Sequence, residues 1–210
     1  MEILKNFAVL EGCDGSGTTS QLNMLRNSFP GNRNLLPPLY KTFEPTNGSI
    51  GIMIRSCLRG KMTLKPETVA LLFAADRYEH IYGPGGIEER CKNGELVISD
   101  RYLLSSLVYQ GITCGEELPA LLNRDFPYPE LLLYLDIESE TALKRIAGRE
   151  HREIFENHDF QAEAGRRYKA LLPSFASCGV RVETIDASLP RGEVAHKVWA
   201  ALMKMPIFKG

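Results

Sequence analysis

A glycine-rich stretch near the start of the chain, VLEGCDGSGTTSQ at residues 9–21, has the spacing of a phosphate-binding loop. Glycines let the backbone of such a loop curl until its N–H groups point at phosphate oxygens, and the helix that follows adds the positive end of its dipole. A hydroxyl at the mouth of the loop can bind Mg²⁺. We therefore expect the phosphates of a nucleotide to bind to the following residues: Gly12, Cys13, Asp14, Gly15, Ser16, Gly17, Thr18, Thr19 and Ser20.

The loop lacks one part of the usual pattern, because Thr18 stands where a lysine normally reaches the β- and γ-phosphates. A dinucleotide-binding fold is the rival interpretation, since Gly15 and Gly17 begin a GxGxxG-like run and Glu44 ends the second strand, where a ribose-binding acid would lie. This interpretation is disfavoured because Ser20 stands where the motif has its third glycine. A dinucleotide-binding fold would also not account for the two motifs described next. A GTPase is disfavoured because the chain contains no NKxD segment for reading guanine.

A second motif, ISDRYLLSSLVYQG at residues 98–111, puts Asp100 at the tip of an apolar strand. A carboxylate in that position can hold hydrated Mg²⁺ across from Thr19 of the loop. Arg101 follows at the same edge, where its planar guanidinium can bind a phosphate through two hydrogen bonds. An ordinary surface ion pair is the alternative interpretation of this Asp-Arg dipeptide.

A third motif, LLFAADR at residues 71–77, places Phe73 and Arg77 four residues apart, on one face of a predicted helix. A flat ring there can stack on a nucleotide base, and the forked guanidinium can donate to a base carbonyl. The alternative is a core phenylalanine beside a solvated arginine.

These candidate residues belong to a chain in which predicted strands and helices alternate. The apolar runs predict strands at residues 6–11, 39–44, 95–100, 130–136 and 181–186. Helical spacing and capping residues predict helices at 18–29, 49–60, 66–81, 101–111, 139–149 and 190–204. Such alternation predicts a parallel sheet with helices on both faces, which binds its ligands at the carboxyl ends of the strands.

The composition is ordinary, with 44% apolar and 24% charged residues. The 210 residues suffice for one sizeable α/β domain, and the formal net charge of −1 gives no sign of a nucleic-acid-binding surface. Five scattered cysteines without a CxxC pair suit reduced thiols better than disulfides or a zinc site. We find no signal peptide and no apolar run of about 18 residues, so we expect a cytoplasmic protein without a membrane partner.

Together the motifs resemble the thymidylate kinase family, whose members transfer a phosphoryl group from ATP to dTMP. The resembling segments occur in family order from Phe7 to Trp199: FAVLEGCDGSGTTSQ, FEPTNGSIGIMIR, LLFAADR, DRYLLSSLVYQG, ELLLYLDIESETALKRIAGR and VRVETIDAS. The resemblance implies the three-layer α/β fold of P-loop kinases, with a five-stranded parallel sheet flanked by helices. It also implies a single nucleoside monophosphate kinase domain over residues 1–210 with a short lid at about 145–156. The resemblance further implies that Mg²⁺ is the cofactor, that ATP donates the phosphoryl group to dTMP, and that the product dTDP serves dTTP synthesis. It also implies a homodimer.

The resemblance further implies roles for individual residues, carried over by position. Phe73 would stack on the thymine and Arg77 would bond its carbonyl, while Tyr109 would pack near the sugar, where such kinases exclude a 2′-hydroxyl. Asp14 would contact the deoxyribose or order the acceptor phosphate. The remaining positions are Arg55 and Arg101 for the acceptor phosphate, Ser106 and Gln110 in the substrate site, and Thr19 and Asp100 for the metal.

Three positions depart from the family pattern, and each has a neutral group in place of a cation. Thr18 replaces the loop lysine, Phe43 replaces an arginine that many members have beside the acceptor phosphate, and Ile154 replaces a lid arginine of many bacterial members. Phosphoryl transfer is catalysed mainly by positioning and charge stabilisation. Losing one such donor raises the barrier by on the order of 3 kcal/mol, so three losses without compensation would silence the enzyme.

Arginines of the expected lid offer compensation. Arg145, Arg149 and Arg152 recur at helical spacing in KRIAGREHR, and a solvated face paired with nearby glutamates is the alternative interpretation. We expect Arg149 or Arg152 to reach the transferring phosphate when the lid closes, which would make them catalytic residues beside Asp14 and Arg101.

Lys41 offers a second source of positive charge near the acceptor phosphate, because it lies two residues before Phe43 on the same side of the strand.

Two alternatives to an active thymidylate kinase stay open. One is a nucleotide-binding homologue that has lost catalysis, and the other is a kinase of altered nucleotide specificity. The intact pair of Phe73 and Arg77 argues against a changed acceptor base.

Overall fold

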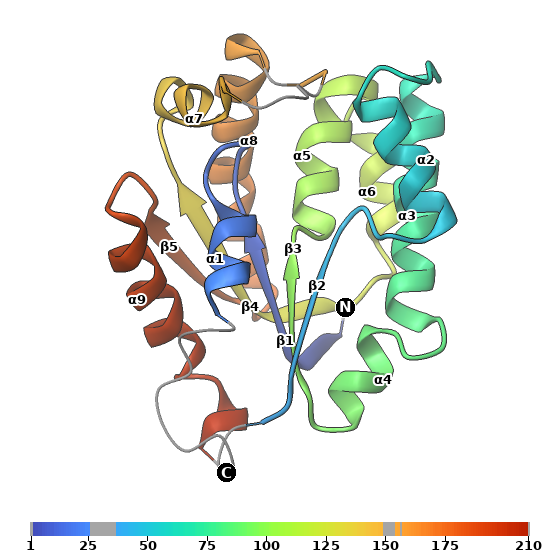
Figure 1. Cartoon of the computed structure of the whole chain (residues 1–210). Coiled ribbons are helices and arrows are strands. Elements are labelled where there is room, and N and C mark those ends of the chain that lie inside the picture. The colour runs from blue at the N-terminus through green and yellow to red at the C-terminus, as the bar shows by residue number, and fades with distance from the viewer. Residues whose placement is uncertain (1, 26–36, 149–153, 156, 210) are drawn as a thin grey trace.

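The sheet of the protein is parallel throughout, and its strands run in the order β2-β3-β1-β4-β5 (Figure 1). This computed structural model describes residues 2–25, 37–148, 154–155 and 157–209. Within that part of the chain the sheet has five strands: β1 (Ile3–Glu11), β2 (Leu39–Phe43), β3 (Leu96–Asp100), β4 (Tyr128–Asp136) and β5 (Arg181–Asp186). The α/β fold with a five-stranded parallel sheet that the sequence predicts is therefore confirmed.

Strand β1 shows why the chain forms a layered structure. Successive side chains of a strand point to opposite faces of its sheet. Phe7 and Val9 accordingly join the buried cluster on one face, while Ala8 and Leu10 join the cluster on the other, and all four side chains are almost fully buried. A strand that is apolar on both faces must be covered on both sides, so helices form an outer layer on each face.

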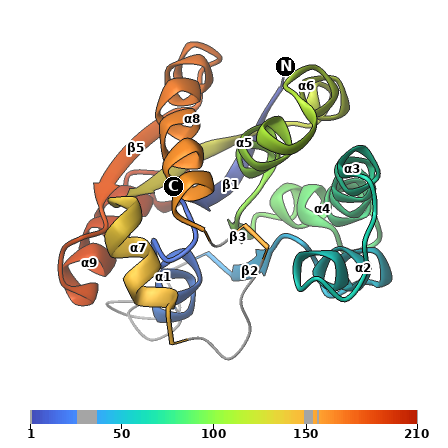
Figure 2. The ribbon, with the colours of Figure 1, turned by 90° about the horizontal axis from the view of Figure 1, so that it is seen from above.

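The helices divide between the two faces of the sheet (Figure 2). One face is covered by α1 (Thr18–Met24) and α9 (Arg191–Leu202), and the other by α4 (Ile87–Lys92), α5 (Leu103–Cys114), α8 (His158–Ser177) and the end of α3 (Pro66–Tyr82). Helices α2 (Ser49–Leu58) and α6 (Glu117–Asn123) pack against α3, and α7 (Ser139–Ile146) packs against α8. A 3₁₀ turn at Pro206–Phe208 follows α9.

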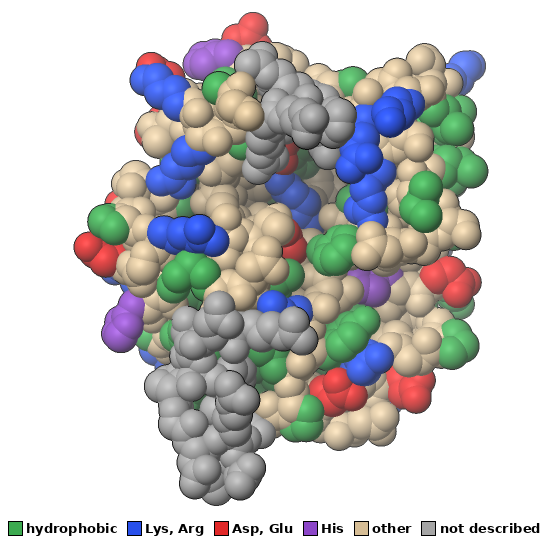
Figure 3. All heavy atoms as spheres, in the orientation of Figure 1, with side chains coloured by type: hydrophobic (Ala, Val, Ile, Leu, Met, Phe, Trp, Pro, Cys, Tyr) green, Lys and Arg blue, Asp and Glu red, His purple; other side chains and the backbone are tan. Residues whose placement is uncertain are grey.

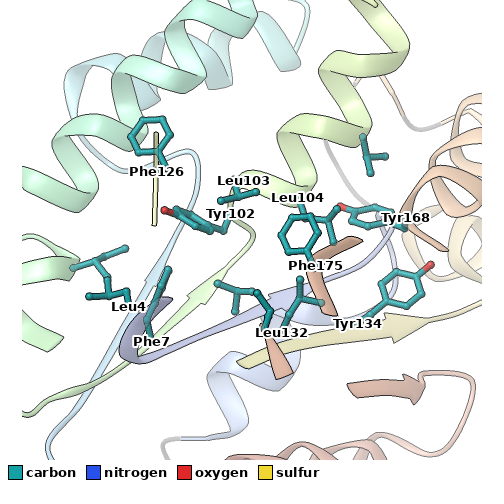
Figure 4. Close-up of a cluster of buried hydrophobic side chains, with 14 of the residues drawn as sticks. Leu4, Phe7, Tyr102, Leu103, Leu104, Phe126, Leu132, Tyr134, Tyr168 and Phe175 are labelled. Atoms are coloured by element: carbon teal, nitrogen blue, oxygen red, sulfur yellow. The ribbon is translucent and has the colours of Figure 1, made fainter. Parts of the chain in front are cut away.

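Aromatic side chains hold α5 and α8 against the sheet (Figure 4). The rings of Phe7 and Tyr102 meet edge to face at 5.0 Å, and those of Tyr134 and Tyr168 lie 5.4 Å apart. Burying each such ring contributes about 2 kcal/mol to the free energy of folding. The consequence for the site is that Tyr168 of α8 is fixed beside the carboxyl ends of the strands.

The sequence predicted the strands closely and the helices less completely. All five strands and the helices around residues 49–58, 66–82, 103–114, 139–146 and 191–202 occur where expected. Helices α4, α6 and α8 were not expected. Phe160, Ala164, Tyr168 and Phe175 of α8 do follow helical spacing, but Pro173 lies inside this helix and obscures the signal. Among the described residues, none of the helices combines the length and the apolar character that a membrane crossing requires.

Candidate functional site

The loop between β1 and α1 has the tight geometry that its glycines predict. Gly15 and Gly17 adopt positive φ angles of 87° and 98°, which side chains with a β-carbon rarely adopt. A β-carbon on Gly15 would lie 2.3 Å from the carbonyl oxygen of Ala142, so α7 packs directly on the loop. Gly17 caps α1, which begins at Thr18, and the N–H groups at the start of a helix favour anions.

The side chain of Thr19, at the start of α1, contacts the end of β3. Because β1 pairs with β3, with Leu10 opposite Asp100, the loop and the Asp100 carboxylate lie at one edge of the sheet. The Thr19 hydroxyl donates to Oδ2 of Asp100 at 2.5 Å. Oδ1 of Asp100 is buried and has no hydrogen-bond partner in the described part of the chain. A hydroxyl beside a carboxylate with an oxygen to spare suits a hard cation such as Mg²⁺, whose other ligands are water and phosphate.

A pocket of about 340 Å³ opens at this edge of the sheet. In the space-filling view it forms a hollow in the upper half of the molecule, with Lys and Arg side chains along its right-hand rim (Figure 3). A pocket of this size accommodates a small organic ligand. From the expected site it is lined by Asp14, Gly15, Gly17, Thr18, Thr19, Ser20, Arg55, Phe73, Arg77, Asp100, Arg101, Ser106, Tyr109 and Gln110.

The guanidinium group of Arg101 links the loop to the pocket. Its Nη1 donates to the carbonyl oxygen of Gly12 at 2.7 Å, and its Nη2 donates to the Asp14 carboxylate. Arg101 has a φ of 71°, in the left-handed region that is uncommon for residues with a side chain. Burial disfavours its charge, but Tyr109 and Asp14 nearby raise the pKa of Arg101 well above its ordinary value. Arg101 is therefore a permanent cation held against the loop.

Arg55 brings a second cation to the pocket from α2. It donates to the carbonyl oxygens of Pro45 and Thr46, the first at 2.5 Å, and its guanidinium lies 5.5 Å from the centre of the Phe43 ring. Phe43 itself lines the pocket and is 37% exposed. The Phe43 ring thus packs beside the guanidinium of Arg55 at the wall of the pocket.

Arg77 lies at the pocket wall, but other protein groups occupy most of its donors. Its Nε and Nη2 donate to Oε2 of Glu44 at 2.9 and 2.6 Å, its Nη1 donates to Asn123, and its Nη2 also donates to the Ser106 hydroxyl at 3.0 Å. The side chain is 1% exposed. Burial raises the pKa of the Glu44 carboxyl, yet the charges of Arg77 and His80 outweigh it and the pKa is lowered overall. Arg77 and Glu44 therefore form a buried ion pair that fixes Ser106.

The remaining wall of the pocket is aromatic. Phe73 from α3 and Tyr109 from α5 both line it, and Phe155 joins them. The Phe155 ring stacks on Phe160 with centroids 4.6 Å apart and meets Tyr109 edge to face at 5.8 Å. The side-chain oxygen of Gln110 is buried and finds no partner among the residues described. Flat rings with a few polar atoms between them suit a nucleotide base and its sugar.

Helix α8 contributes a residue that the sequence analysis missed. Gln161 is fully buried; its Oε1 accepts from the backbone N–H of Asp14 at 3.1 Å and its Nε2 donates to the Asp14 carboxylate at 2.9 Å. The same Nε2 donates to the carbonyl oxygen of Phe155 at 3.0 Å. Asn157, which caps α8 by accepting from the N–H of Phe160, is the sequence signal that could have revealed this helix and its first turns.

Some expected residues lie elsewhere. Gly12, Cys13 and Ser16 belong to the loop but do not line the pocket, and burial raises the pKa of the Cys13 thiol to about 12, which leaves it inert. The expectation for Lys41 was wrong, because its ammonium donates to the carbonyl oxygen of Leu22 beneath α1 and does not line the pocket. Arg149 and Arg152, with residues 150, 151, 153 and 156 of the expected lid, lie outside the described residues.

Comparison with known proteins gives one consistent result. The sequence model of the family described as thymidylate kinase matches residues 10–198. A protein of Treponema pallidum (strain Nichols) named "Putative thymidylate kinase" is 39% identical, covering 94% of this chain and 94% of its own length. A protein of the same name from Aeropyrum pernix is 38% identical over 92% and 95% of the two chains. A "Probable thymidylate kinase" of Methanococcus aeolicus is 41% identical over 80% of each chain.

Proposed function

The chain belongs to the thymidylate kinase family of enzymes, which use a nucleotide as phosphoryl donor, and on that premise we propose that it phosphorylates dTMP to dTDP with ATP and Mg²⁺, in dTTP synthesis. The observation that carries the proposal is a single pocket that joins the phosphate loop, the Thr19–Asp100 pair and an aromatic wall. The proposed location is the cytoplasm, where nucleotide synthesis takes place, and neither nucleic acid nor membrane is expected as a partner.

In the proposed reaction an acceptor phosphate oxygen of dTMP attacks the γ-phosphorus of ATP in line, and the bond to the bridging oxygen of ADP breaks. The backbone N–H groups of residues 14–19 hold the donor phosphates. Thr19 and Asp100 would hold Mg²⁺, which supplies charge neutralisation to the phosphates when bound. Arg101 and Arg55 neutralise the charge that moves. The attacking oxygen is already anionic, so the reaction needs no general base.

The acceptor nucleotide is proposed to lie along the aromatic wall. Phe73 would stack on the thymine, and Tyr109 would pack against the sugar where a 2′-hydroxyl is excluded. The hydroxyl of Ser106 accepts from Arg77, so its own hydrogen can be donated to a base carbonyl. Gln110 offers to the same edge of the base its side-chain oxygen, which has no partner among the residues described. Asp14, held by Arg101 and Gln161, would order the deoxyribose or the acceptor phosphate.

The direct test is dTDP formation from dTMP and Mg-ATP, with dUMP, dCMP and dGMP as competing acceptors. Phe73→Ala is expected to raise KM for dTMP by about 5- to 150-fold, because stacking of a base on an aromatic ring is worth about 1–3 kcal/mol. Phe208→Ala, an aromatic truncation on the other face of the sheet, serves as the matched control and should leave KM unchanged. Preference for another monophosphate would establish the alternative of altered specificity.

A nucleotide-binding homologue without catalysis is the second candidate, and one observation favours it. Thr18 is buried at the pocket wall, at the loop position where a lysine normally contacts the phosphates. This candidate predicts that dTMP or ATP binds while turnover stays near background. The catalytic domain is proposed to span residues 1–210 with residues 145–156 as its lid, so Arg149 and Arg152 remain the proposed source of the missing charge.

A homodimer is also proposed, and an exposed apolar surface supports it. Helix α3 packs against both α2 and α6, at the side of the molecule away from α9 (Figure 1). Large apolar side chains on these three helices are 40–59% exposed: Ile52, Met53, Leu71, Tyr78, Tyr82 and Leu121. Exposed apolar side chains that gather on packed neighbouring helices support an interface between proteins.

Leu71→Asp is expected to shift the protein from dimer to monomer, because association would bury an unpaired carboxylate. Sedimentation velocity over a dilution series measures the change. Met203→Asp places the same charge at an exposed apolar residue beyond α9 and should leave the dimer intact. Equal sedimentation of all three proteins would reject this surface as the interface.

A further inference from the structure

Glu11, the last residue of β1, carries a fully buried carboxyl group that does not line the pocket. Four donors surround it. Its Oε1 accepts from the backbone N–H groups of Tyr102 at 3.0 Å and Ser105 at 3.3 Å, and its Oε2 accepts from the Ser105 hydroxyl at 2.6 Å. The Tyr168 hydroxyl donates to the same oxygen at 3.3 Å. Such a set of donors suits a carboxylate, which only accepts.

Two hydroxyl groups connect this carboxylate to Arg101. Nη1 of Arg101 lies 3.2 Å from the Ser105 hydroxyl oxygen and 3.1 Å from that of Tyr168. Because a guanidinium only donates, each hydroxyl is the acceptor in its contact with Arg101, and the two hydrogens of Nη1 are shared among these hydroxyls and the carbonyl oxygen of Gly12. The two hydroxyls are 2.8 Å apart, so the onward path leads from Tyr168 through Ser105 to Glu11 or directly to Glu11. The cation at one end only donates and the anion at the other only accepts, so the hydroxyl hydrogens point toward Glu11, while either hydroxyl can donate in the contact between them.

The network determines where the guanidinium of Arg101 points. Nη1 is held by the two hydroxyls and by the carbonyl oxygen of Gly12, which leaves Nη2 directed at Asp14 and the pocket. The backbone of Arg101 is in the left-handed region, so the main chain alone does not favour this placement. A side chain with several rotatable bonds needs such contacts to stay in one orientation.

We propose that Glu11 is a positioning residue for Arg101, which it orients toward the reacting phosphate through the hydroxyl groups of Ser105 and Tyr168. The inference rests on the proposed function to the extent that Arg101 contacts a phosphate of the bound nucleotide. Glu11 itself touches no substrate. Burial raises the pKa of Glu11 to about 7, and the hydrogen bonds from Ser105 and the charge of Arg101 oppose that rise. Above that pH the group is ionised and can accept from both hydroxyls.

The test compares ligands with and without the phosphate. In Glu11→Gln the new amide donates to the hydroxyls, which then lose the acceptor for their own hydrogens. We expect the affinity for dTMP, measured by calorimetry, to fall about tenfold while the affinity for thymidine stays within about twofold. We also expect kcat to fall more than KM for ATP rises. Glu130→Gln, a carboxylate that accepts from the backbone of Asn6 at the other end of the sheet, is the matched control.

A double-mutant cycle separates positioning from a structural role. Tyr168→Phe removes one hydroxyl and leaves the packed ring. If Glu11→Gln does not fold, the affinities for dTMP and thymidine are compared in Tyr168→Phe instead. If Glu11 acts through the hydroxyls, adding Glu11→Gln to Tyr168→Phe and Ser105→Ala will change the affinity for dTMP little further. Equal losses for dTMP and thymidine, or fully additive losses in the cycle, would overturn the proposal. A wild type that binds dTMP without converting it would refute the proposed function, and the comparison of the two affinities would still decide this inference.

Discussion

Arg101→Ala is expected to lower kcat for phosphoryl transfer from ATP to dTMP by about 100- to 1,000-fold, the usual cost of removing one preorganised donor from a transition state. Arg101 is the cation that touches both the loop, through Gly12, and the wall of the pocket. Alanine keeps the β-carbon, so the left-handed backbone at this residue carries similar strain in both proteins. Steady-state kinetics at saturating ATP and dTMP measure the effect.

Arg101→Lys shows whether charge alone suffices. A lysine has one ammonium group, which cannot hold the carbonyl oxygen of Gly12 and reach Asp14 at the same time. We therefore expect kcat to stay at least about tenfold below that of the wild type. Arg124→Ala removes an arginine whose side chain is 65% exposed on the surface and should leave kcat unchanged. A loss of less than about threefold in Arg101→Ala would show that the guanidinium does not act on the moving charge.

Thr18→Lys is expected to raise kcat by about tenfold or more, because it returns a cation to the loop position that normally contacts the transferred phosphate. Within the described residues the pocket is lined by three cationic side chains, those of Arg55, Arg77 and Arg101. The charge of Arg77 is balanced by Glu44, whose carboxylate lies 2.6 Å away. The net positive charge available to the donor phosphates is therefore smaller than three cationic side chains would give. Wild type and variant are compared in parallel for dTDP formation.

Three outcomes of this comparison lead to different conclusions. Strong turnover by the wild type without any gain in Thr18→Lys would mean that the missing charge is replaced, and Arg149→Ala and Arg152→Ala become the next variants. Weak turnover that the lysine restores would mean a kinase disabled at one residue. Near-zero turnover in both proteins with dTMP still bound would favour the nucleotide-binding homologue. Thr18→Met, similar in length but neutral, controls for the altered packing.

Local sequence patterns were enough to predict the parallel sheet and the glycine loop of this protein. A strand buried on both faces is a continuous apolar run, and the loop is specified by glycines at residues 15 and 17, whose positive φ angles only glycine adopts easily. The position of Glu11 and Asp100 at one edge of the sheet could be predicted because the carboxyl ends of parallel strands lie at the same edge. These properties depend on residues close together in the chain, so they can be read without the fold.

The partners of the charged side chains were decided by tertiary structure alone. Gln161 reaches Asp14 across 147 residues of sequence, and Tyr168 reaches Glu11 across 157, because α8 packs against the sheet at that edge. The same packing gives Arg101 its orientation. No local pattern reports such contacts, since a buried polar group takes whichever partner the packed elements bring within hydrogen-bond distance. The sequence by itself therefore determined the fold and most of the pocket wall, whereas the electrostatic network behind Arg101 exists only once α8 has docked.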